Sequence, residues 1–242
     1  MIDHSDRPDD NADTRTIADY IYQELHRDIV SGVLIPGTKL RMSKFSRHYG
    51  VGISPLREAL VKLTGDALVR TEGQRGFWVS PISAGELEDT TEIRVLIETE
   101  AVVRSIRLGD HAWEERVREA HVTLREFTER LAESDDERAL AAWEHANRRF
   151  HDALCSACGS PWLMRVRHML DRHAERYRAI VLPNRRMDPD THDENDALAE
   201  AVLGRKALRA GHLVRLHVQR TANCVREAMR MGEPDKAAVS AV

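Results

Sequence analysis

The stretch Val51–Leu68, VGISPLREALVKLTGDAL, decides the architecture of the first third of the chain. Four apolar residues recur in it at three- and four-residue spacing, which predicts a helix with one buried face: Leu56, Ala59, Leu60 and Leu63. Ser54 is a favourable N-cap, and Pro55 suits the first helical position, where a missing N–H costs nothing. Arg57 and Lys62 are then left on the outer face. A short basic helix after a tight turn is typical of the recognition helix of a helix-turn-helix, which enters the major groove of DNA.

Two further helices are predicted before this stretch. Residues 14–31 carry apolar side chains on one helical face, and these are expected to point inward: Ile17, Tyr20, Ile21, Leu25 and Ile29. A short extended piece follows over 39–41. Ser43 is the expected N-cap of the second helix, which carries Phe45 and Tyr49 inward.

A hairpin is predicted after the recognition helix. Residues 68–71 and 77–80 have the composition of two strands. The segment between them contains two glycines and an exposed arginine, as tight hairpin tips do: Glu72, Gly73, Gln74, Arg75 and Gly76. Beside a basic helix, we interpret this hairpin as a wing whose tip reaches into a minor groove. The alternative is an ordinary solvated hairpin without a DNA contact.

The composition indicates a globular chain with an uneven distribution of charge. The 242 residues are 42% hydrophobic and 31% charged, and no apolar run approaches the roughly 20 residues of a membrane span. Between Arg15 and Ser80, 10 Lys/Arg accompany 6 Asp/Glu, a net charge of +4; the whole chain carries −4, so the remainder carries −8. A basic module on an acidic body is typical of a nucleic-acid binder with a second function. The acidic, polar N-terminus differs from a signal peptide, so we expect a cytoplasmic protein.

The cysteines do not indicate a disulfide framework. The chain has three, Cys155, Cys158 and Cys224, an odd and small number. The spacing of Cys155 and Cys158 occurs in redox and zinc sites, but a second pair is missing. Structural thiols are the preferred interpretation.

The rest of the chain is predicted to be helical. Apolar residues recur at helical spacing in six segments, 84–108, 112–133, 136–157, 160–182, 189–203 and 206–231. The fold class is therefore mostly α, a winged helix-turn-helix followed by an all-α bundle large enough to hold a cavity. The expected organisation is a disordered tail over 1–12, a DNA-binding domain over 13–80, a linker over 81–86, an effector-binding and dimerisation domain over 87–232 and a loose tail over 233–242.

Several strings of the N-terminal part resemble the winged-helix domain of the GntR family of transcriptional regulators. They are GxLxPGxxL over 32–40, YGV over 49–51, SPLREAL over 54–60 and GFxV over 76–79. The resemblance implies a homodimeric repressor that reads a short palindrome in double-stranded operator DNA. The residues expected at the DNA are Ser43, Lys44, Gly52, Ile53, Ser54, Arg57, Lys62, Gly73, Gln74 and Arg75.

One departure from the family concerns the start of the recognition helix. Family members commonly have Arg where this chain has Ile53, and a small hydroxyl residue where it has Gly52. We expect base readout to differ there, with an apolar contact to a thymine methyl. For Arg57, the alternative to DNA contact is a salt bridge on the helix surface.

The helical part resembles the FadR-like branch of the family, which carries an FCD domain. The marks are Glu92-x-Arg94-x-x-x-Glu98, the string Asn147-Arg-Arg-Phe-His151 and the late His217. The sugar-responsive and aminotransferase-like branches have different second domains. The resemblance implies an effector site built from Arg94, Asn147, His151, Tyr177, Asn195 and His217.

The same resemblance implies a divalent metal, such as Zn, Ni or Mn, at Asn147, His151, Asn195 and His217. Asn147 and His151 lie one turn apart and face the same way. The family has a histidine where this chain has Asn195, and His192, one turn earlier, could replace it. Because amides are weak ligands for transition metals, a metal-free pocket that hydrogen-bonds an anion is an alternative. A third alternative is a set of buried polar residues with no ligand.

Arg94 is expected inside the bundle because apolar residues flank it, Ile93, Leu96 and Ile97 among them. A buried arginine requires a partner. That partner is either Glu98, one turn on, or a ligand carboxylate held in a bidentate pair.

Separated strings resemble one glutarate-responsive, carbon-starvation-induced branch of the family: VGISPLREAL, EGQRGFWVSP, SIRLGDHAWE, CGSPWL and HAERYR. This implies a repressor of a catabolic operon that a small dicarboxylate, glutarate, releases from its operator. The alternative is a regulator of the same fold that responds to another organic acid with a bound metal. A helical metallohydrolase using His151 and His217 is a remote alternative, because no nucleophile–base–acid set accompanies them; we do not expect an enzyme.

Overall fold

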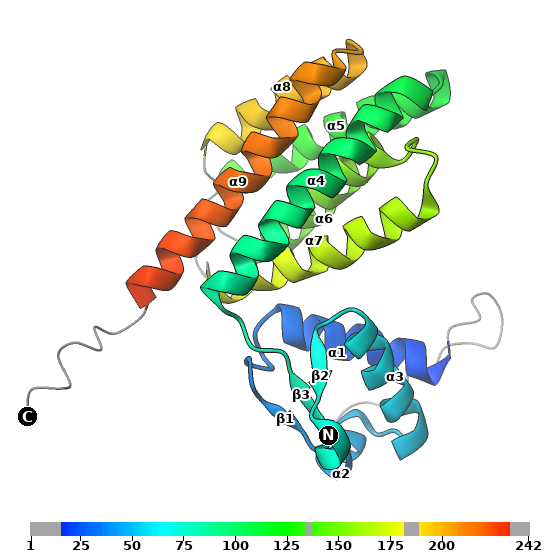
Figure 1. Cartoon of the computed structure of the whole chain (residues 1–242), viewed down its shortest axis with the longest axis vertical. Helices are drawn as coiled ribbons and strands as arrows, with labels where there is room; N and C mark the ends of the chain where they lie inside the picture. The colour runs from blue at the N-terminus through cyan, green and yellow to red at the C-terminus, as the bar shows by residue number, and fades with distance from the viewer. Residues whose placement is uncertain (1–15, 134–136, 182–188, 233–242) are drawn as a thin grey trace, which may run out of the picture. The chain divides into compact units, whose positions relative to one another are not determined.

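The computed structural model describes residues 16–133, 137–181 and 189–232 (Figure 1). The chain forms two compact units, divided between Pro81 and Ile82. The ranges 1–12 and 233–242, for which a disordered and a loose tail are predicted, lie outside the described residues. In the described part, no helix is both long and apolar enough to cross a membrane.

The first unit combines helices with a small sheet. Its elements are α1 (Ile17–Val30), β1 (Lys39–Leu40), α2 (Met42–Tyr49), α3 (Ile53–Gly65), β2 (Val69–Thr71), a 3₁₀ turn (Gly73–Arg75) and β3 (Phe77–Val79). β3 is the middle strand and pairs antiparallel with both β1 and β2. The predicted extended piece and the predicted hairpin thus belong to one sheet.

The core of this unit is hydrocarbon. The four apolar residues that predicted α3 are completely buried, and they pack with three residues of α1: Ile21, Leu25 and Ile29. Phe45 of α2 belongs to the same cluster, as do residues in and next to the sheet: Leu40, Leu68, Val69, Phe77 and Val79. The predicted buried face of α3 is therefore confirmed.

The predicted caps of α2 and α3 are wrong. α3 begins at Ile53, so Ser54 lies inside its first turn. The reason is that Gly52 is already extended, at φ −67° and ψ 162°, and its carbonyl accepts from a helical N–H. α2 likewise begins after Arg41, whose carbonyl accepts from the N–H of Phe45, so Ser43 is not its cap.

Two residues expected inside α1 lie outside. Ile17 is 63% exposed and Tyr20 is 58% exposed. Both occupy the first turn of the helix, and the core cluster begins only at Ile21. The apolar stripe on α1 is therefore longer than the surface that covers it.

The second unit is a helical bundle. Its helices are α4 (Ala84–Leu108), α5 (His111–Ala132), α6 (Glu137–Cys155), α7 (Pro161–Val181), α8 (Pro189–Leu203) and α9 (Ala207–Gly232). The six predicted ranges agree with these bounds to within two residues. Residues 84–86, expected in the linker 81–86, instead form the first turn of α4, which the hydroxyl of Ser83 caps.

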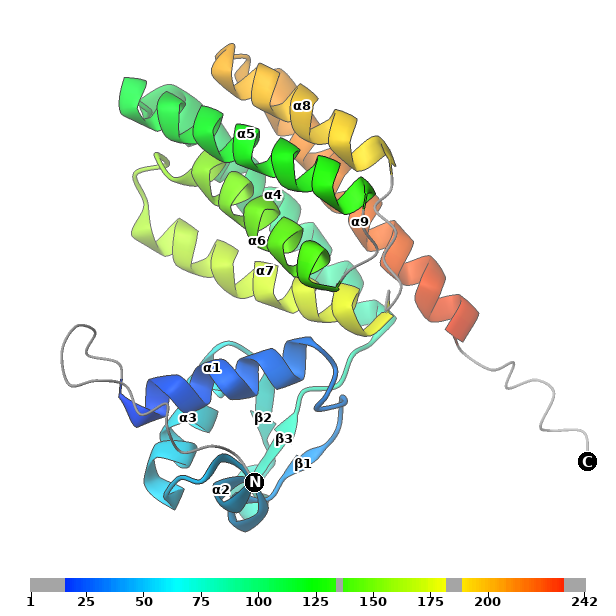
Figure 2. The ribbon, with the colours of Figure 1, turned by 180° about the vertical axis from the view of Figure 1, so that it is seen from behind.

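α4 is the central helix of the bundle. It lies side by side with α9 and also packs against α6 and α7, whereas α5 packs against α6 and α8 (Figures 1 and 2). Trp113 and Phe150 are fully buried in the main core. A second, smaller cluster joins Leu87, Tyr177, Ala222 and Val225, and Ile82 and Met229 pack against it.

Candidate functional site

The outer face of α3 presents the side chains expected at DNA. Ile53, Ser54 and Arg57 are exposed, and no side chain caps the N-terminus of the helix. Within the described residues, Arg57 makes no hydrogen bond or ion pair, so the salt bridge considered for it is absent. A free guanidinium beside uncapped backbone N–H groups suits contacts with phosphates and base edges.

Lys62 is held differently from Arg57. Its ammonium lies 2.8 Å from the Asp19 carboxylate of α1 and 3.1 Å from Glu58. These partners raise the pKa of Lys62. The side chain is thus engaged within the protein, while Ser43 and Lys44 in the first turn of α2 are exposed.

The wing tip adopts a backbone that requires glycine. Gly73 and Gly76 have φ of 55° and 112°, values that residues with a Cβ rarely adopt. Arg75 between them is exposed, and the side chain of Gln74 lies outside the described residues. At the base of the hairpin, the Lys39 ammonium sits 4.7 Å from the centre of the Trp78 ring.

Inside the bundle, two of the predicted effector residues meet. The rings of His151 on α6 and His217 on α9 stack with their centres 4.8 Å apart and 28° between their planes. The Nδ1–H of His217 donates to the Glu194 carboxylate at 2.9 Å, and Arg220 donates to the same carboxylate at 2.7 Å. Glu194 of α8 therefore orients His217 and leaves its Nε2 free for another partner.

Three polar atoms of the predicted site are buried without a hydrogen-bond partner. They are Asn147 Oδ1, His151 Nε2 and Asn195 Oδ1. Buried polar groups are nearly always paired in native proteins. Burial, together with the neighbouring His217, Arg167 and Arg94, lowers the pKa of His151 well below its usual value. The imidazole is therefore neutral, and it can accept or donate a hydrogen bond according to its tautomer.

Arg94 pairs with the residue predicted from the sequence, Glu98. Its guanidinium contacts the Glu98 carboxylate at 2.8 and 2.9 Å, and Asp171 of α7 lies 3.7 Å away. Ile93 and Leu96, expected to flank the core, are exposed instead. Arg94 lies on the inner face of α4 with Val95 and Glu98, which are both buried.

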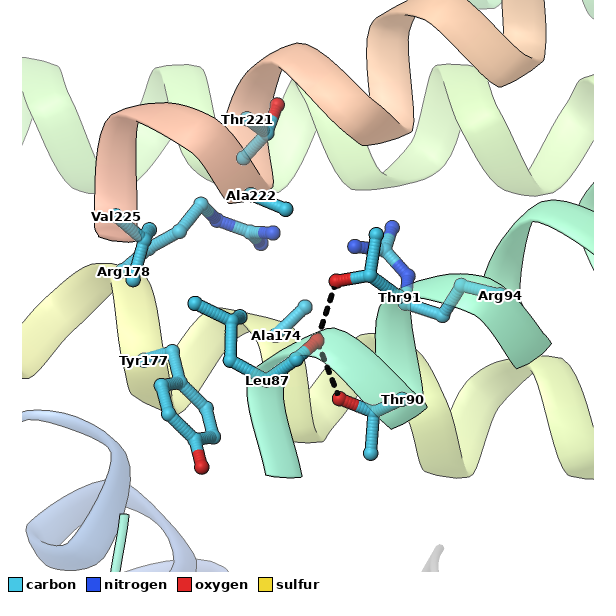
Figure 3. Close-up of a pocket in the computed structure, with 10 residues that line it drawn as sticks. All are labelled: Leu87, Thr90, Thr91, Arg94, Ala174, Tyr177, Arg178, Thr221, Ala222 and Val225. Atoms are coloured by element: carbon cyan, nitrogen blue, oxygen red, sulfur yellow. Dashed lines mark hydrogen bonds between the residues drawn. The ribbon is translucent and has the colours of Figure 1, made fainter. Parts of the chain in front are cut away.

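A pocket opens between α4, α7 and α9 next to this ion pair (Figure 3). It is a small hollow that is partly open to solvent. Its lining comprises Leu87, Thr90, Thr91, Arg94, Ala174, Tyr177, Arg178, Thr221, Ala222 and Val225. Thr221 follows His217 by one turn of α9, and its hydroxyl donates to the His217 carbonyl at 3.1 Å. His217 thus lies one turn of α9 away from the lining residue Thr221.

Tyr177 contributes its ring to the pocket but not its hydroxyl. The hydroxyl accepts from the N–H of Ser83 at 2.9 Å and donates to Glu86 at 2.6 Å, and Figure 3 shows it turned away from the other lining side chains. Burial and the Glu86 carboxylate raise the pKa of this phenol. Tyr177, predicted to bind the effector, therefore ties α7 to the start of α4.

Comparison with known families identifies both units. Residues 17–79 match the model described as bacterial regulatory proteins, gntR family, and residues 89–220 match the FCD domain. The chain belongs to the GntR family and carries an FCD domain. It is 36% identical to an uncharacterized HTH-type regulator, BphR, of Paraburkholderia xenovorans over 89% of this chain and 88% of that protein. It is 35% identical to the HTH-type transcriptional repressor GlaR of Escherichia coli over 86% of this chain and 95% of that protein.

Solved structures show the same fold. A GntR regulator from Rhodococcus superposes with a TM-score of 0.68 at 22% identity, covering 87% of this chain and 98% of that one. The Escherichia coli protein McbR superposes with a TM-score of 0.70 at 17% identity, covering 88% and 99%. Because the matched families and relatives are transcriptional regulators, the hydrolase alternative is set aside.

A metal implied by the FCD resemblance does not fit the donors present. Among the described residues, no three His, Cys, Asp or Glu side chains are grouped to hold a metal ion. The predicted set offers only the imidazoles of His151 and His217 with two neutral amides, and the guanidiniums of Arg94 and Arg167 add positive charge near His151. Amide oxygens bind transition metals weakly. The side chain of His192, the suggested substitute, lies outside the described residues.

The cysteines of this FCD domain do not suggest a reactive site. Cys155 and Cys158 are buried, Cys224 is exposed, and all three are free thiols. Burial raises the pKa of the Cys155 thiol to about 12, which keeps it protonated and unreactive. This agrees with the structural interpretation.

The predicted effector set leaves out one residue of the FCD pocket, Arg178, which the sequence marks only as one of several basic residues in this region. It follows Tyr177 on α7, and its guanidinium points into the pocket (Figure 3). Arginines crowd α7, and spacing alone does not distinguish one that faces the pocket from one on the surface. The packing of α7 against α4 and α9 decides it.

Proposed function

We propose that this protein is a cytoplasmic, homodimeric repressor that a small dicarboxylate, with glutarate as the first candidate, releases from its operator. The observation that carries the effector half is the set of buried polar atoms without partners beside a pocket lined by two arginines. Buried hydrogen-bonding groups without partners in the interior of a DNA-binding regulator favour the binding of a polar ligand there. The choice of glutarate as the first candidate rests on the sequence resemblance described above.

In the DNA half, α3 enters a major groove and the wing at Gly73–Gly76 reaches the adjacent minor groove. Ile53, exposed at the first position of α3, faces a thymine methyl, and Arg57 contacts a base edge or a phosphate. Because Lys62 is paired with Asp19 and Glu58, it contributes less than Arg57.

A gel-shift titration with the operator tests this half. Arg57→Ala is expected to weaken binding by about 5- to 150-fold, the equivalent of about 1–3 kcal/mol. Arg27→Ala is the matched control, because Arg27 is an exposed arginine of α1 that pairs with its own helix. Operator affinity that stayed unchanged in Arg57→Ala would contradict the proposed role of α3.

In the effector half, the dicarboxylate occupies the bundle without a metal. Rotation of the Asn147 and Asn195 amides, and the Nε2–H tautomer of His151, supply donors for a carboxylate. Arg94 adds the charge. The ligand shifts the equilibrium only by its differential affinity for the DNA-competent and released states.

Thermal shift and calorimetry with a ligand panel test the effector half. Glutarate is expected to raise the melting temperature and to lower operator affinity, with succinate, adipate and glutaramate as comparisons. The same titration after EDTA treatment distinguishes a metal-dependent regulator, because a metal-free pocket keeps its response. If no member of the panel changed either the melting temperature or operator affinity, the dicarboxylate proposal would be wrong.

Tyr177 is the proposed link between the pocket and the DNA-binding unit. Its ring belongs to the cluster that contains Ile82, and its hydroxyl is bonded to Ser83 and Glu86. Ser83 follows the last residue of the first unit, Pro81, by two positions. A ligand that moves the ring therefore moves the end of the linker.

Tyr177→Phe tests this link, since it keeps the ring and removes the hydroxyl. Glutarate is expected to bind the variant nearly as well as wild type, whereas its effect on operator affinity shrinks. Tyr20→Phe, on an exposed tyrosine of α1, is the control and leaves both measurements unchanged. A full operator response in Tyr177→Phe would exclude the hydroxyl as the coupling group.

A further inference from the structure

The pocket of Figure 3 brings two positive charges together. The guanidiniums of Arg94 on α4 and Arg178 on α7 point toward one another from opposite walls. Like charges that converge in a partly enclosed space repel and are costly to bury. An arrangement of this kind is stabilised by an anion between the two groups.

The two arginines differ in how many of their N–H donors are already paired within the protein. Arg94 pairs Nε and one terminal nitrogen with the Glu98 carboxylate. Arg178 makes no hydrogen bond and no ion pair with any residue that the structure describes. The Asp171 carboxylate stabilises the charges of both arginines electrostatically, but it forms no hydrogen bond with either, and its distance from the Arg94 guanidinium is 3.7 Å. Arg178 therefore has five N–H donors for a ligand.

The other polar groups of the pocket do not compete for an anion. The Thr90 hydroxyl donates to the carbonyls of Glu86 and Leu87, and that of Thr91 donates to the Leu87 carbonyl. The Thr221 hydroxyl donates to the His217 carbonyl. Their remaining capacity is to accept hydrogen bonds, which an oxyanion cannot use. Recognition of an anion here depends on the guanidiniums.

We propose that Arg178 is a carboxylate anchor of the effector pocket and that it sets the preference for a dicarboxylate over a monocarboxylate. One carboxylate lies between Arg178 and the free face of Arg94. The other end of the ligand reaches toward His217, which precedes Thr221 of the pocket by one turn, about 6 Å along α9. This inference rests on the proposed effector function and names a recognition residue for it.

Calorimetry with paired ligands tests the anchor. Glutaramate has the chain of glutarate with one carboxylate replaced by a neutral amide. Wild type is expected to prefer glutarate by tenfold or more, and Arg178→Gln is expected to bind glutarate at least tenfold more weakly. The ratio of glutarate to glutaramate affinity should fall toward one in the variant. Arg165→Gln, an exposed arginine of the same helix, should retain the wild-type ratio.

The rise in melting temperature on adding glutarate supplies a second readout. Because Arg178 also stabilises the buried Asp171 carboxylate, the variant without ligand is compared only with itself, and glutarate is expected to raise its melting temperature less than that of wild type. If glutarate does not bind wild type, the proposed effector fails, and titration with malonate, succinate and adipate then decides the anchor. An unchanged glutarate affinity in Arg178→Gln, or an unchanged rise in its melting temperature with glutarate, overturns the inference.

Discussion

The two units of this protein differ in what fills their interiors. In the described part of the first unit, Ser80 is the one polar side chain in the buried class, and it donates to the Ala67 carbonyl at 2.7 Å. The described residues of the bundle include eight buried polar side chains: Thr91, Glu98, Ser105, Thr128, Arg167, His173, Arg176 and Asn195. Under the proposed function, the first unit uses its core for stability and its surface for recognition, whereas the second recognises its ligand from inside.

The difference teaches where each unit can tolerate change. A hydrocarbon core loses stability whenever atoms are removed, because a cavity remains. An interior that holds unpartnered polar atoms is already less stable than a packed apolar core, so substitutions of those groups are expected to change function more than stability. Three experiments examine this contrast, from the largest expected effect to the smallest.

Leu60→Ala examines the hydrocarbon core of the first unit. Leu60 is fully buried on α3, so the substitution should lower the free energy of unfolding of this unit by about 3 kcal/mol. Calorimetric melting, with operator binding as the readout for the first unit, measures the loss. Asn195→Leu is the counterpart in the bundle and should be neutral or stabilising, because it removes an unpartnered buried amide. Equal losses in both variants would remove the contrast between the units.

Asn195→His examines whether one amide is what separates the predicted His151 and His217 set from a metal site. A third imidazole beside His151 and His217 should create affinity for Ni²⁺ or Zn²⁺ that wild type lacks. At a metal concentration 100 times the Kd, binding stabilises the bundle by about 2.7 kcal/mol. Thermal melting with and without EDTA measures it. Asn223→His, on an exposed residue of α9, should show no comparable gain; tight metal binding by wild type would mean that the amides suffice.

Asp171→Asn examines the charge balance around the pocket. Burial would raise the pKa of the Asp171 carboxyl, but Arg178, Arg94 and Arg167 outweigh it and lower the pKa to about 2. Because the folded pKa lies below the usual 3.8, the carboxylate stabilises the fold above about pH 4, and this contribution is lost as the pH falls toward 2.

The variant should therefore be less stable than wild type by about 2 kcal/mol at pH 7. The gap should close as the pH approaches 2, which denaturant unfolding at several pH values measures. Asp193→Asn, on an exposed carboxylate of α8, is the control. A gap that did not change with pH would show that the three arginines do not stabilise the Asp171 charge.

Sequence periodicity predicted the helices of the bundle because each buries one continuous apolar face. Helix N-caps were harder to predict, because a residue can cap a helix with its backbone carbonyl alone and needs no particular side chain. Gly52 does so for α3, one residue ahead of the cap expected at Ser54. The predicted effector residues stay a prediction: the structure stacks His151 on His217 and leaves the side-chain oxygens of Asn147 and Asn195 without a hydrogen-bond partner.

Individual roles in the pocket depend on contacts between distant segments. Tyr177 turned out to bond with Ser83 and Glu86, 94 and 91 residues away. Arg178 faces the pocket because of how α7 crosses α4 and α9. Neither fact has a local sequence pattern, so neither could be read before the helices were placed.

The attachment of Ile82 to the bundle has a practical meaning for protein engineering. Ile82 packs with the cluster of Leu87 and Tyr177, and Ser83 caps α4. A chimaera that joins this bundle to another DNA-binding unit should be joined before Ile82. A junction placed three or four residues later would remove the Ser83 hydroxyl that caps α4 and the packing of Ile82, and under the proposed function the bundle would then bind its effector without changing operator affinity.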